Sequence, residues 1–318
     1  MQMLILSTTR LTAEIERQLQ EQYKDYTFRY MENIKAAQRY LKDADILLTY
    51  GNDIAASDIE KAKSLKWIMV LSAGIDGMPL EVIKQRQILL TNVRGIHKTQ
   101  MAEYAVAMLL SHYQNLTIFN QRQKDKLWDK TIKRREITGR TITIVGAGSI
   151  GEELARLAKA FQMKTIAVTY SGGSRPHFDY VYRQNDLEQA LKEADFVVSI
   201  LPSTKETEGY YKEQHFKWMK KTAIFLNIGR GTAVDEEILL GALDNGEIEH
   251  AILDVTPIEP LPKESRLWSH EKVTLTPHVS GGSDRYIPRA MELFEKSLNQ
   301  YIATGTVSIN KINLDRGY

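Results

Sequence analysis

Short apolar runs alternate with amphipathic segments along the first ninety residues of the chain. The segment 11–23, between the first two runs, places Leu11, Ile15 and Leu19 at helical spacing. Strand-like runs that are apolar on both faces and separated by helices predict a parallel sheet covered on both sides. The four runs are LILST (4–8), DILLTY (45–50), WIMVL (67–71) and ILLTN (88–92).

A longer helical pattern at 99–116 is apolar around much of its circumference, which predicts a helix buried between two lobes or in a subunit interface. We expect it to connect the lobes. A helix near 235–245 has Asp235 as a suitable N-cap and Gly246 as a suitable residue after its end. The alternation resumes with six strand-like runs: TITIV (141–145), TIAVTY (165–170), FVVSIL (196–201), AIFLN (223–227), HAILDV (250–255) and VTL (273–275).

The order of these elements predicts an α/β protein of two doubly wound parallel-sheet lobes. The last helical pattern, at 288–305, comes too late to extend the second sheet, so we expect it to return to the first lobe. The first domain is then discontinuous, comprising 1–96 and 284–318, and the second, 97–283, is inserted in it.

The composition is that of a soluble globular protein, with 43% hydrophobic and 26% charged residues among 318. Lys and Arg total 42 against 40 Asp and Glu, so no charge excess points to nucleic acid or an anionic membrane. The lack of cysteine excludes disulfides, thiolate zinc sites and a cysteine nucleophile. The histidines show no paired ligand spacing, so we predict no metal site. The first ten residues lack a signal-peptide pattern and no run approaches the ~18–20 apolar residues of a membrane span, so we expect a cytoplasmic protein.

A glycine-rich loop follows the strand at 141–145 directly and opens a helix with apolar residues at helical spacing. This context is what the G-x-G-x-x-G pattern of dinucleotide-binding domains requires. Its glycines permit a tight turn, a close approach of the backbone to a pyrophosphate, and close packing of helix on strand, and the helix N-terminus offers N–H groups to the phosphates. The predicted cofactor contacts here are Gly146, Gly148, Ser149, Ile150 and Gly151.

Polar residues follow three later strands of the same lobe, where ligands of open α/β sheets bind. Arg230 follows the strand at 223–227, Asp254 ends the strand at 250–255 with Glu259 in the loop beyond, and His278 follows the last strand. A histidine at a strand end is often structural, and either acid alone would be interpreted as a surface residue. The convergence of all of them at one sheet edge favours a reaction site.

The chemistry of these side chains suits reduction of a 2-oxo acid. The planar fork of Arg230 can grip a carboxylate or a carbonyl oxygen. A hydride that reaches a ketone carbon leaves an alkoxide, and histidine is the proton donor best suited to it near neutral pH. Glu259 would stabilise the protonated imidazole of His278 and fix its ring.

The motifs resemble those of the D-isomer-specific 2-hydroxyacid dehydrogenase family over nearly the whole chain, in the family's order and spacing. The resemblance implies an NAD(P)-dependent oxidoreductase in which a Rossmann coenzyme domain is inserted in a flavodoxin-like substrate domain. It also implies a homodimer formed through the region around the 99–116 helix. The motifs are SAGIDG (72–77), AEYAVAMLL (102–110), GAGSIG (146–151), LNIGRG (226–231), LDVTPIEPLP (253–262) and TPHVSGG (276–282).

The same resemblance implies roles for single residues. Arg230 would orient the substrate, Glu259 would support the proton donor, and His278 would be that donor. Backbone N–H groups at Ala73 and Gly74 would hold the substrate carboxylate. Further cofactor contacts would come from Asp254, on the nicotinamide carboxamide, and from residues lining the cofactor cleft: Leu201, Pro202, Ile228, Gly229 and Ser280.

The stretch after the second strand of the coenzyme domain departs from the pattern of NAD-selective sites. Such sites carry an acid about 20 residues beyond the glycine loop, whereas VTYSGGSRP (168–176) contains no carboxylate that would repel a 2′-phosphate. Arg175 could approach such a phosphate, which predicts a preference for NADP(H) over NAD(H). Alternatively, Arg175 is a solvated loop residue and the site is indifferent to the phosphate. The hydroxyl groups that could donate to the phosphate are those of Thr169, Ser171 and Ser174.

The segments RLWSHEKV (266–273) and NLDRGY (313–318) are similar to the glyoxylate/hydroxypyruvate reductase branch of the family. The predicted substrates are therefore small 2-oxo acids of that kind, reduced to D-2-hydroxy acids, and His97 could lie at the rim of the cleft. Two alternatives stay open: a dehydrogenase of a phosphorylated hydroxy acid such as phosphoglycerate, and a regulator of the same fold that senses nicotinamide nucleotides without turnover.

Overall fold

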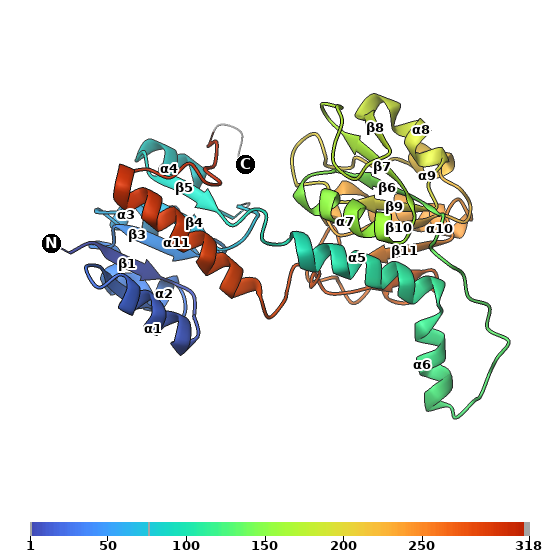
Figure 1. Cartoon of the computed structure of the whole chain (residues 1–318), viewed down its shortest axis with the longest axis horizontal. Coiled ribbons are helices and arrows are strands. Elements are labelled where there is room, and N and C mark those ends of the chain that lie inside the picture. Colours follow the sequence, from blue (N-terminus) through green and yellow to red (C-terminus); the bar gives the residue numbers. More distant parts are fainter. Residues whose placement is uncertain (1, 76, 315–318) are drawn as a thin grey trace. The chain divides into compact units, whose positions relative to one another are not determined.

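The computed structural model describes residues 2–75 and 77–314 of the chain (Figure 1). Asp76, within SAGIDG, and 315–318, within NLDRGY, lie outside the described residues. The chain forms two compact units: unit 1 comprises Met1–Ile96 with Ser283–Tyr318, and unit 2 comprises His97–Gly282.

Five strands of unit 1 form a parallel sheet in the order β2-β1-β3-β4-β5 within the part of the chain that the structure describes. Helices α2 (Ile34–Leu41), α3 (Ala56–Lys61) and α4 (Leu80–Gln85) pack on one face. Helices α1 (Ala13–Gln22) and α11 (Tyr286–Thr304) pack on the other. The strands are β1 (Leu4–Ser7), β2 (Thr27–Tyr30), β3 (Ile46–Thr49), β4 (Trp67–Val70) and β5 (Leu89–Asn92).

The C-terminal helix returns to the first lobe, as its late position in the sequence predicted. The indole ring of Trp67, fully buried in β4, lies 5.9 Å from the ring of Phe294 and 5.3 Å from that of Tyr301. Aromatic contacts of this kind bury large apolar areas. They fasten α11 to a sheet built from the other end of the chain.

Unit 2 contains a parallel sheet in the order β12-β11-β10-β9-β6-β7-β8. Helices α5 (Lys98–Tyr113) and α7 (Ser149–Ala160) cover one face, and α8 (Leu187–Lys192), α9 (Glu213–Trp218) and α10 (Glu236–Asp244) cover the other. The two parallel sheets confirm the predicted fold class. The strands are β6 (Thr141–Val145), β7 (Lys164–Thr169), β8 (Tyr180–Arg183), β9 (Phe196–Ser199), β10 (Ile224–Asn227), β11 (His250–Leu253) and β12 (Val273–Leu275).

The strand order of unit 2 reverses between β6 and β9, which are neighbours in the sheet. Such a reversal opens a crevice at the carboxyl ends of the strands, where ligands of this fold class bind. The loops after β6, β9, β10, β11 and β12 all emerge at that edge because every strand of the sheet is parallel. The strand order and direction therefore bring the candidate residues of unit 2 to one edge of the sheet.

The structure adds elements that the sequence patterns missed and shortens one predicted helix. The sequence patterns missed β2, α2 and β8, because β2 and β8 are edge strands with few buried residues and lack the apolar runs that marked the others. The helix expected at 99–116 ends at Tyr113, since Asn115 adopts a left-handed conformation (φ 54°) and a new helix, α6 (Leu116–Lys124), begins there. Within unit 2, α6 and the loop after it extend away from the sheet and its covering helices (Figure 1).

The helix at 236–244 has the ends that the sequence predicted. The side chain of Asp235 accepts hydrogen bonds from the N–H groups of Glu237 and Ile238, and Gly246 has a φ of 65° just after the helix. No helix in the described residues is long and apolar enough to cross a membrane.

Candidate active site

The glycine loop after β6 has the geometry that a dinucleotide requires. Gly146 has a φ of 93°, and a Cβ atom there would lie 2.7 Å from the carbonyl oxygen of Ile200, so the loops after β6 and β9 approach closely. A Cβ on Gly148 would meet nothing within 4 Å, which leaves this turn open to a ligand. A Cβ on Gly151 would lie 3.1 Å from Cγ2 of Ile144, so α7 packs tightly on β6. Gly146 thus permits the tight turn and Gly151 the close packing of helix on strand, while Gly148 leaves room for a ligand.

The N-terminus of α7 offers hydrogen-bond donors at this turn. Within the described chain, the N–H groups of Ser149, Ile150 and Gly151 have no acceptor, and the cap residue Gly148 has no side chain to supply one. Unsatisfied N–H groups and the positive end of the helix dipole favour an anion. The loop therefore fits a pyrophosphate.

The stretch after β7 forms a tight turn. The hydroxyl oxygen of Thr169 accepts a hydrogen bond of 3.0 Å from the N–H of Gly172, while Ser171 and Ser174 are exposed. The Arg175 guanidinium lies 3.3 Å from a carboxylate oxygen of Glu152 on α7. The stretch itself contains no carboxylate, as the sequence showed. The fold, however, brings the carboxylate of Glu152 from α7 to Arg175.

His278 and Glu259 form a direct pair. The Nδ1 atom of His278 lies 2.7 Å from Oε2 of Glu259, and Oε1 of Glu259 accepts a hydrogen bond of 3.1 Å from the N–H of Thr256. His278 has a φ of 54°, a left-handed conformation that costs free energy in a residue with a Cβ atom. The surrounding loop must therefore hold this backbone in place.

Asp254 holds it. This carboxylate is 1% exposed, and its oxygens accept hydrogen bonds of 2.9 Å from the N–H groups of both Val279 and Ser280 and of 2.6 Å from the hydroxyl of Thr276. Its main-chain oxygen accepts a further bond, of 2.8 Å, from the N–H of His278. The described hydrogen bonds that Asp254 accepts thus all come from the loop that presents His278.

Tyr104 of α5 extends this network. Its hydroxyl lies 2.6 Å from that of Thr276, which in turn donates to Asp254. Burial, more than the charge of Asp254, raises the pKa of Tyr104 to about 12, so the phenol stays protonated and available as a hydrogen-bond donor. The apolar pattern of α5 marked the helix but not this polar contact.

Two glycines fix the backbone around Arg230. A Cβ on Gly229 would lie 2.6 Å from both the nitrogen and the oxygen of Leu201, and one on Gly231 would overlap the carbonyl group of Thr256. The loop after β10 is therefore pressed between the loop after β9 and the loop after β11. Because the N–H of Thr256 binds Glu259, the segments of Arg230, Glu259 and His278 form one continuous set of contacts.

His97, at the start of α5, is partly buried beside these loops. Burial in the first place, and the nearby charge of Arg230 in the second, lower its pKa to about 4, so the imidazole is neutral at pH 7. A Cβ on Gly281 would lie 3.3 Å from its ring. His97 therefore lies close to Arg230 and to the end of the His278 loop.

The remaining predicted cofactor contacts of unit 2 lie at the same sheet edge. Leu201, Ile228, Gly229 and Ser280 are buried, whereas Pro202 is exposed. In unit 1, Ala73 and Gly74 follow β4, and their carbonyl groups accept hydrogen bonds from Asn92 (2.7 Å) and Ser72 (2.5 Å). Their N–H groups have no acceptor in the described part of the chain, which leaves two adjacent donors for an anion.

Comparisons with known proteins agree with this geometry. Residues 106–280 match the family model described as D-isomer specific 2-hydroxyacid dehydrogenase, NAD binding domain. The chain belongs to this family. It is 33% identical over 267 residues to a glyoxylate reductase of Pyrococcus furiosus, covering 81% of this chain and 79% of the relative. It is 34% identical over 245 residues to a glyoxylate/hydroxypyruvate reductase B of Klebsiella pneumoniae, covering 76% of each.

Solved structures give the same family. A D-isomer specific 2-hydroxyacid dehydrogenase family protein of Aeromonas salmonicida has a TM-score of 0.90 and 34% identity, over 99% of this chain and all of the other. An NADPH-dependent glyoxylate/hydroxypyruvate reductase of Sinorhizobium meliloti, solved with NADP and sulfate, has a TM-score of 0.83 and 25% identity over 99% and 100% of the chains. This 2-hydroxyacid dehydrogenase is accordingly an NAD(P)-dependent oxidoreductase of the Rossmann type.

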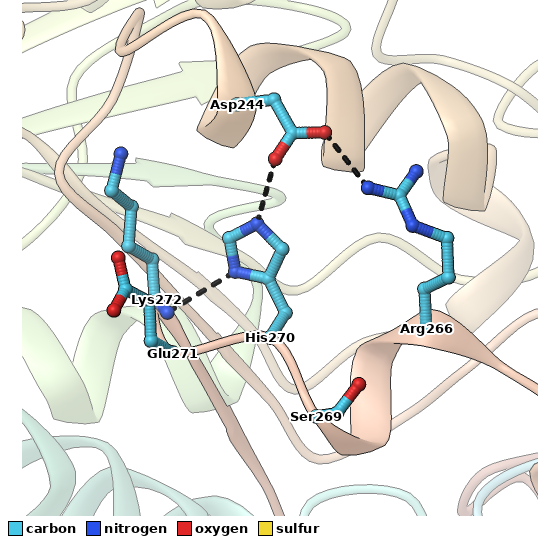
Figure 2. Close-up of a pocket in the computed structure, with 6 residues that line it drawn as sticks. All are labelled: Asp244, Arg266, Ser269, His270, Glu271 and Lys272. Carbon is cyan, nitrogen blue, oxygen red and sulfur yellow. Dashed lines mark hydrogen bonds and ion pairs between the residues drawn. The ribbon is translucent and has the colours of Figure 1, made fainter.

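A hollow elsewhere on unit 2 is separate from the dehydrogenase site. It is lined by Asp244, Arg266, Ser269, His270, Glu271 and Lys272, ahead of β12 and so at the amino edge of the sheet (Figure 2). Figure 2 shows the Asp244 carboxylate between His270 (3.1 Å) and Arg266 (2.9 Å). The segment that resembled the glyoxylate/hydroxypyruvate reductase branch thus contributes a salt-bridge cluster and not a part of the dehydrogenase site.

Replacing Gly231 by alanine should impair both folding and catalysis. The new Cβ would displace the Thr256 carbonyl and with it the contact that orients Glu259. We expect a loss of about 1–3 kcal/mol in the free energy of unfolding and a fall in kcat of about 100-fold, measured by denaturant titration and steady-state kinetics.

Gly241→Ala is the matched control, because a Cβ at this helical position meets nothing within 4 Å. It should leave kcat unchanged and stability unchanged or raised. A Gly231→Ala protein as stable and as active as the wild type would show that the close approach of the two loops is unimportant.

Proposed function

We propose that this dehydrogenase reduces small 2-oxo acids of the glyoxylate and hydroxypyruvate kind to D-2-hydroxy acids, with NADPH preferred over NADH. The observation that carries the proposal is the 2.7 Å distance between Nδ1 of His278 and Oε2 of Glu259. The His278 loop is held by hydrogen bonds to Asp254, and it lies at the same sheet edge as the glycine loop, whose geometry fits a dinucleotide. The names of the relatives from Pyrococcus furiosus and Klebsiella pneumoniae support the substrate class.

In this mechanism the side chains of the chain bind the substrate and move a proton. A nicotinamide cofactor, held by the glycine loop, would supply the hydride that reduces the carbonyl group of the substrate. His278, held at Nδ1 by Glu259, donates the proton on Nε2 to the resulting alkoxide oxygen. Within unit 2, Arg230 orients the oxygen atoms of the substrate.

The preference for NADPH rests on the turn after β7. The end of β7 carries Thr169 where an NAD-selective site carries a carboxylate. The neighbour from Sinorhizobium meliloti is described as NADPH-dependent. A positively charged side chain near this turn would favour the 2′-phosphate.

The proposed activity is tested by following absorbance at 340 nm for a panel of 2-oxo acids, with and without a phosphate group, using NADPH and NADH in turn. Turnover of glyoxylate and hydroxypyruvate, faster with NADPH, is the expected result. Turnover confined to phosphorylated acids would favour the phosphoglycerate type of dehydrogenase, and cofactor binding without any turnover would favour the nucleotide-sensing regulator.

We also propose that the protein is a homodimer formed through α6 and the loop after it. No residue of α6 is buried in the described chain. Leu116 and Leu127 are about half exposed, Trp128 is 91% exposed, and Ile118 is also exposed. Apolar side chains gathered on a projecting segment are typical of a subunit interface.

Replacing Trp128 by aspartate should therefore dissociate the dimer. We expect light scattering after gel filtration to give twice 36.4 kDa for the wild type and a single chain mass for the variant. Trp268→Asp, at an exposed indole elsewhere on unit 2, is the control and should stay dimeric. A monomeric wild type would refute the proposal.

Replacing His278 by alanine should depress kcat by roughly 10²–10⁴-fold, because the proton donor acts mainly in the transition state. Binding of the cofactor, measured by fluorescence titration, should be largely retained. His270→Ala, in the amino-edge hollow, serves as a control that should keep its turnover. A His278→Ala enzyme with most of its turnover would remove this residue from the mechanism.

Replacing Glu259 by glutamine should lower kcat for reduction by at least about tenfold. The carboxylate oxygens hold both Nδ1 of His278 and the N–H of Thr256, whereas the amide of glutamine has only one acceptor oxygen, so the imidazole ring loses its fixed orientation. The rate is measured with a fixed 2-oxo acid at one fixed pH. Glu264→Gln, which changes an exposed acid nearby, should leave kcat unchanged; an unchanged kcat in Glu259→Gln would contradict the pairing.

A further inference from the structure

Arg183 lies beside the position that decides cofactor preference. It is the last residue of β8, the edge strand that the sequence patterns missed, and it pairs in register with Thr169, the last residue of β7. Neighbouring strands lie about 5 Å apart. The Arg183 side chain therefore starts one strand away from the place where an NAD-selective site carries its acid.

The side chain of Arg183 lies against the turn that follows β7. A Cβ atom built on Gly172 would lie 3.0 Å from Cγ and 3.1 Å from Nε of Arg183. Gly172 also has a φ of 69°, and its N–H donates a hydrogen bond to the Thr169 hydroxyl oxygen, so the turn is stabilised by its own residues. The Arg183 side chain, from Cγ to Nε, thus lies beside Gly172 in the turn that follows β7.

The two arginines near this turn differ in what balances their charge. Arg175 is paired with Glu152 at 3.3 Å, and both side chains are about one third exposed. Arg183 is exposed, and within residues 2–75 and 77–314 it has neither an ion pair nor a side-chain hydrogen bond. A phosphate near Arg175 would also meet the negative charge of Glu152, whereas Arg183 brings no acid with it.

We infer that Arg183 is the residue that pairs with the 2′-phosphate of NADPH, and that Arg175 serves mainly to hold the turn through Glu152. The assignment rests on the proposed preference for NADPH and names the residue responsible for it. A guanidinium binds a phosphate dianion through charge-assisted hydrogen bonds, and a flexible side chain held along the turn can reach it with little rearrangement.

Binding measurements test the assignment without any turnover. The probes are NADPH and NADH, titrated by fluorescence, and 2′,5′-ADP and 5′-AMP, titrated by calorimetry at fixed ionic strength. Arg183→Ala should weaken NADPH and 2′,5′-ADP by roughly 10- to 100-fold and change NADH and 5′-AMP by less than about twofold. Arg183→Lys should recover part of the loss, because it keeps the charge but not the planar fork.

Arg175→Ala is the matched control, since it removes an arginine from the same turn. It should weaken the phosphorylated and unphosphorylated ligands to the same extent, which marks a structural role. Selective loss of NADPH and 2′,5′-ADP in Arg175→Ala, or unchanged binding in Arg183→Ala, would overturn the assignment. A wild type that binds NADPH and NADH equally would refute both the preference and the assignment, while turnover of 2-oxo acids with either cofactor would leave the proposed reaction intact.

Discussion

The site depends on one buried carboxylate, that of Asp254. A charged group that is 1% exposed is costly unless hydrogen bonds replace its hydration. In the part of the chain that the structure describes, the hydrogen bonds to the carboxylate come from Thr276, Val279 and Ser280, so the loop that presents His278 must close around it for the fold to be stable. That closure holds His278 at a φ of 54°, a conformation that the residue would not adopt by itself. The hydrogen bonds that compensate for burying the charge of Asp254 therefore also hold His278 in its orientation.

Close contacts between neighbouring loops extend this constraint across the carboxyl edge of the sheet. Gly146 and Gly229 both bring their backbones against residues 200–201, and Gly231 brings its backbone against Thr256. Any side chain at these positions would separate loops that carry different functional groups. Because every strand of the sheet is parallel and the order reverses beside β6, loops far apart in the sequence are available for these contacts. The geometry of the site therefore follows from the backbone as much as from the side chains.

The sequence predicted the parts of this arrangement that leave a local signal. Buried strands leave apolar runs, the glycine loop leaves a spacing, and the polar residues after consecutive strands must meet at one sheet edge. Contacts between distant segments leave no such signal. Glu152 reaches Arg175 only because α7 packs beside the turn after β7. Strand β8 lies at the edge of the sheet and has no fully buried residue, so it leaves no apolar run in the sequence. For Asp254, strand position placed it at the site, but only the fold shows the loop that it holds.

Two acids of unit 2, Asp254 and Glu152, are engaged by the protein itself, and both shape a loop. Near these loops, the groups that the described chain leaves without a partner include three kinds of donor: the Nε2 side of His278, the N–H groups that begin α7, and the guanidinium of Arg183. A site that offers donors and withholds acceptors is complementary to ligands that carry phosphates and carboxylates. This asymmetry, more than any single residue, explains why the edge suits an anionic dinucleotide and an anionic substrate together.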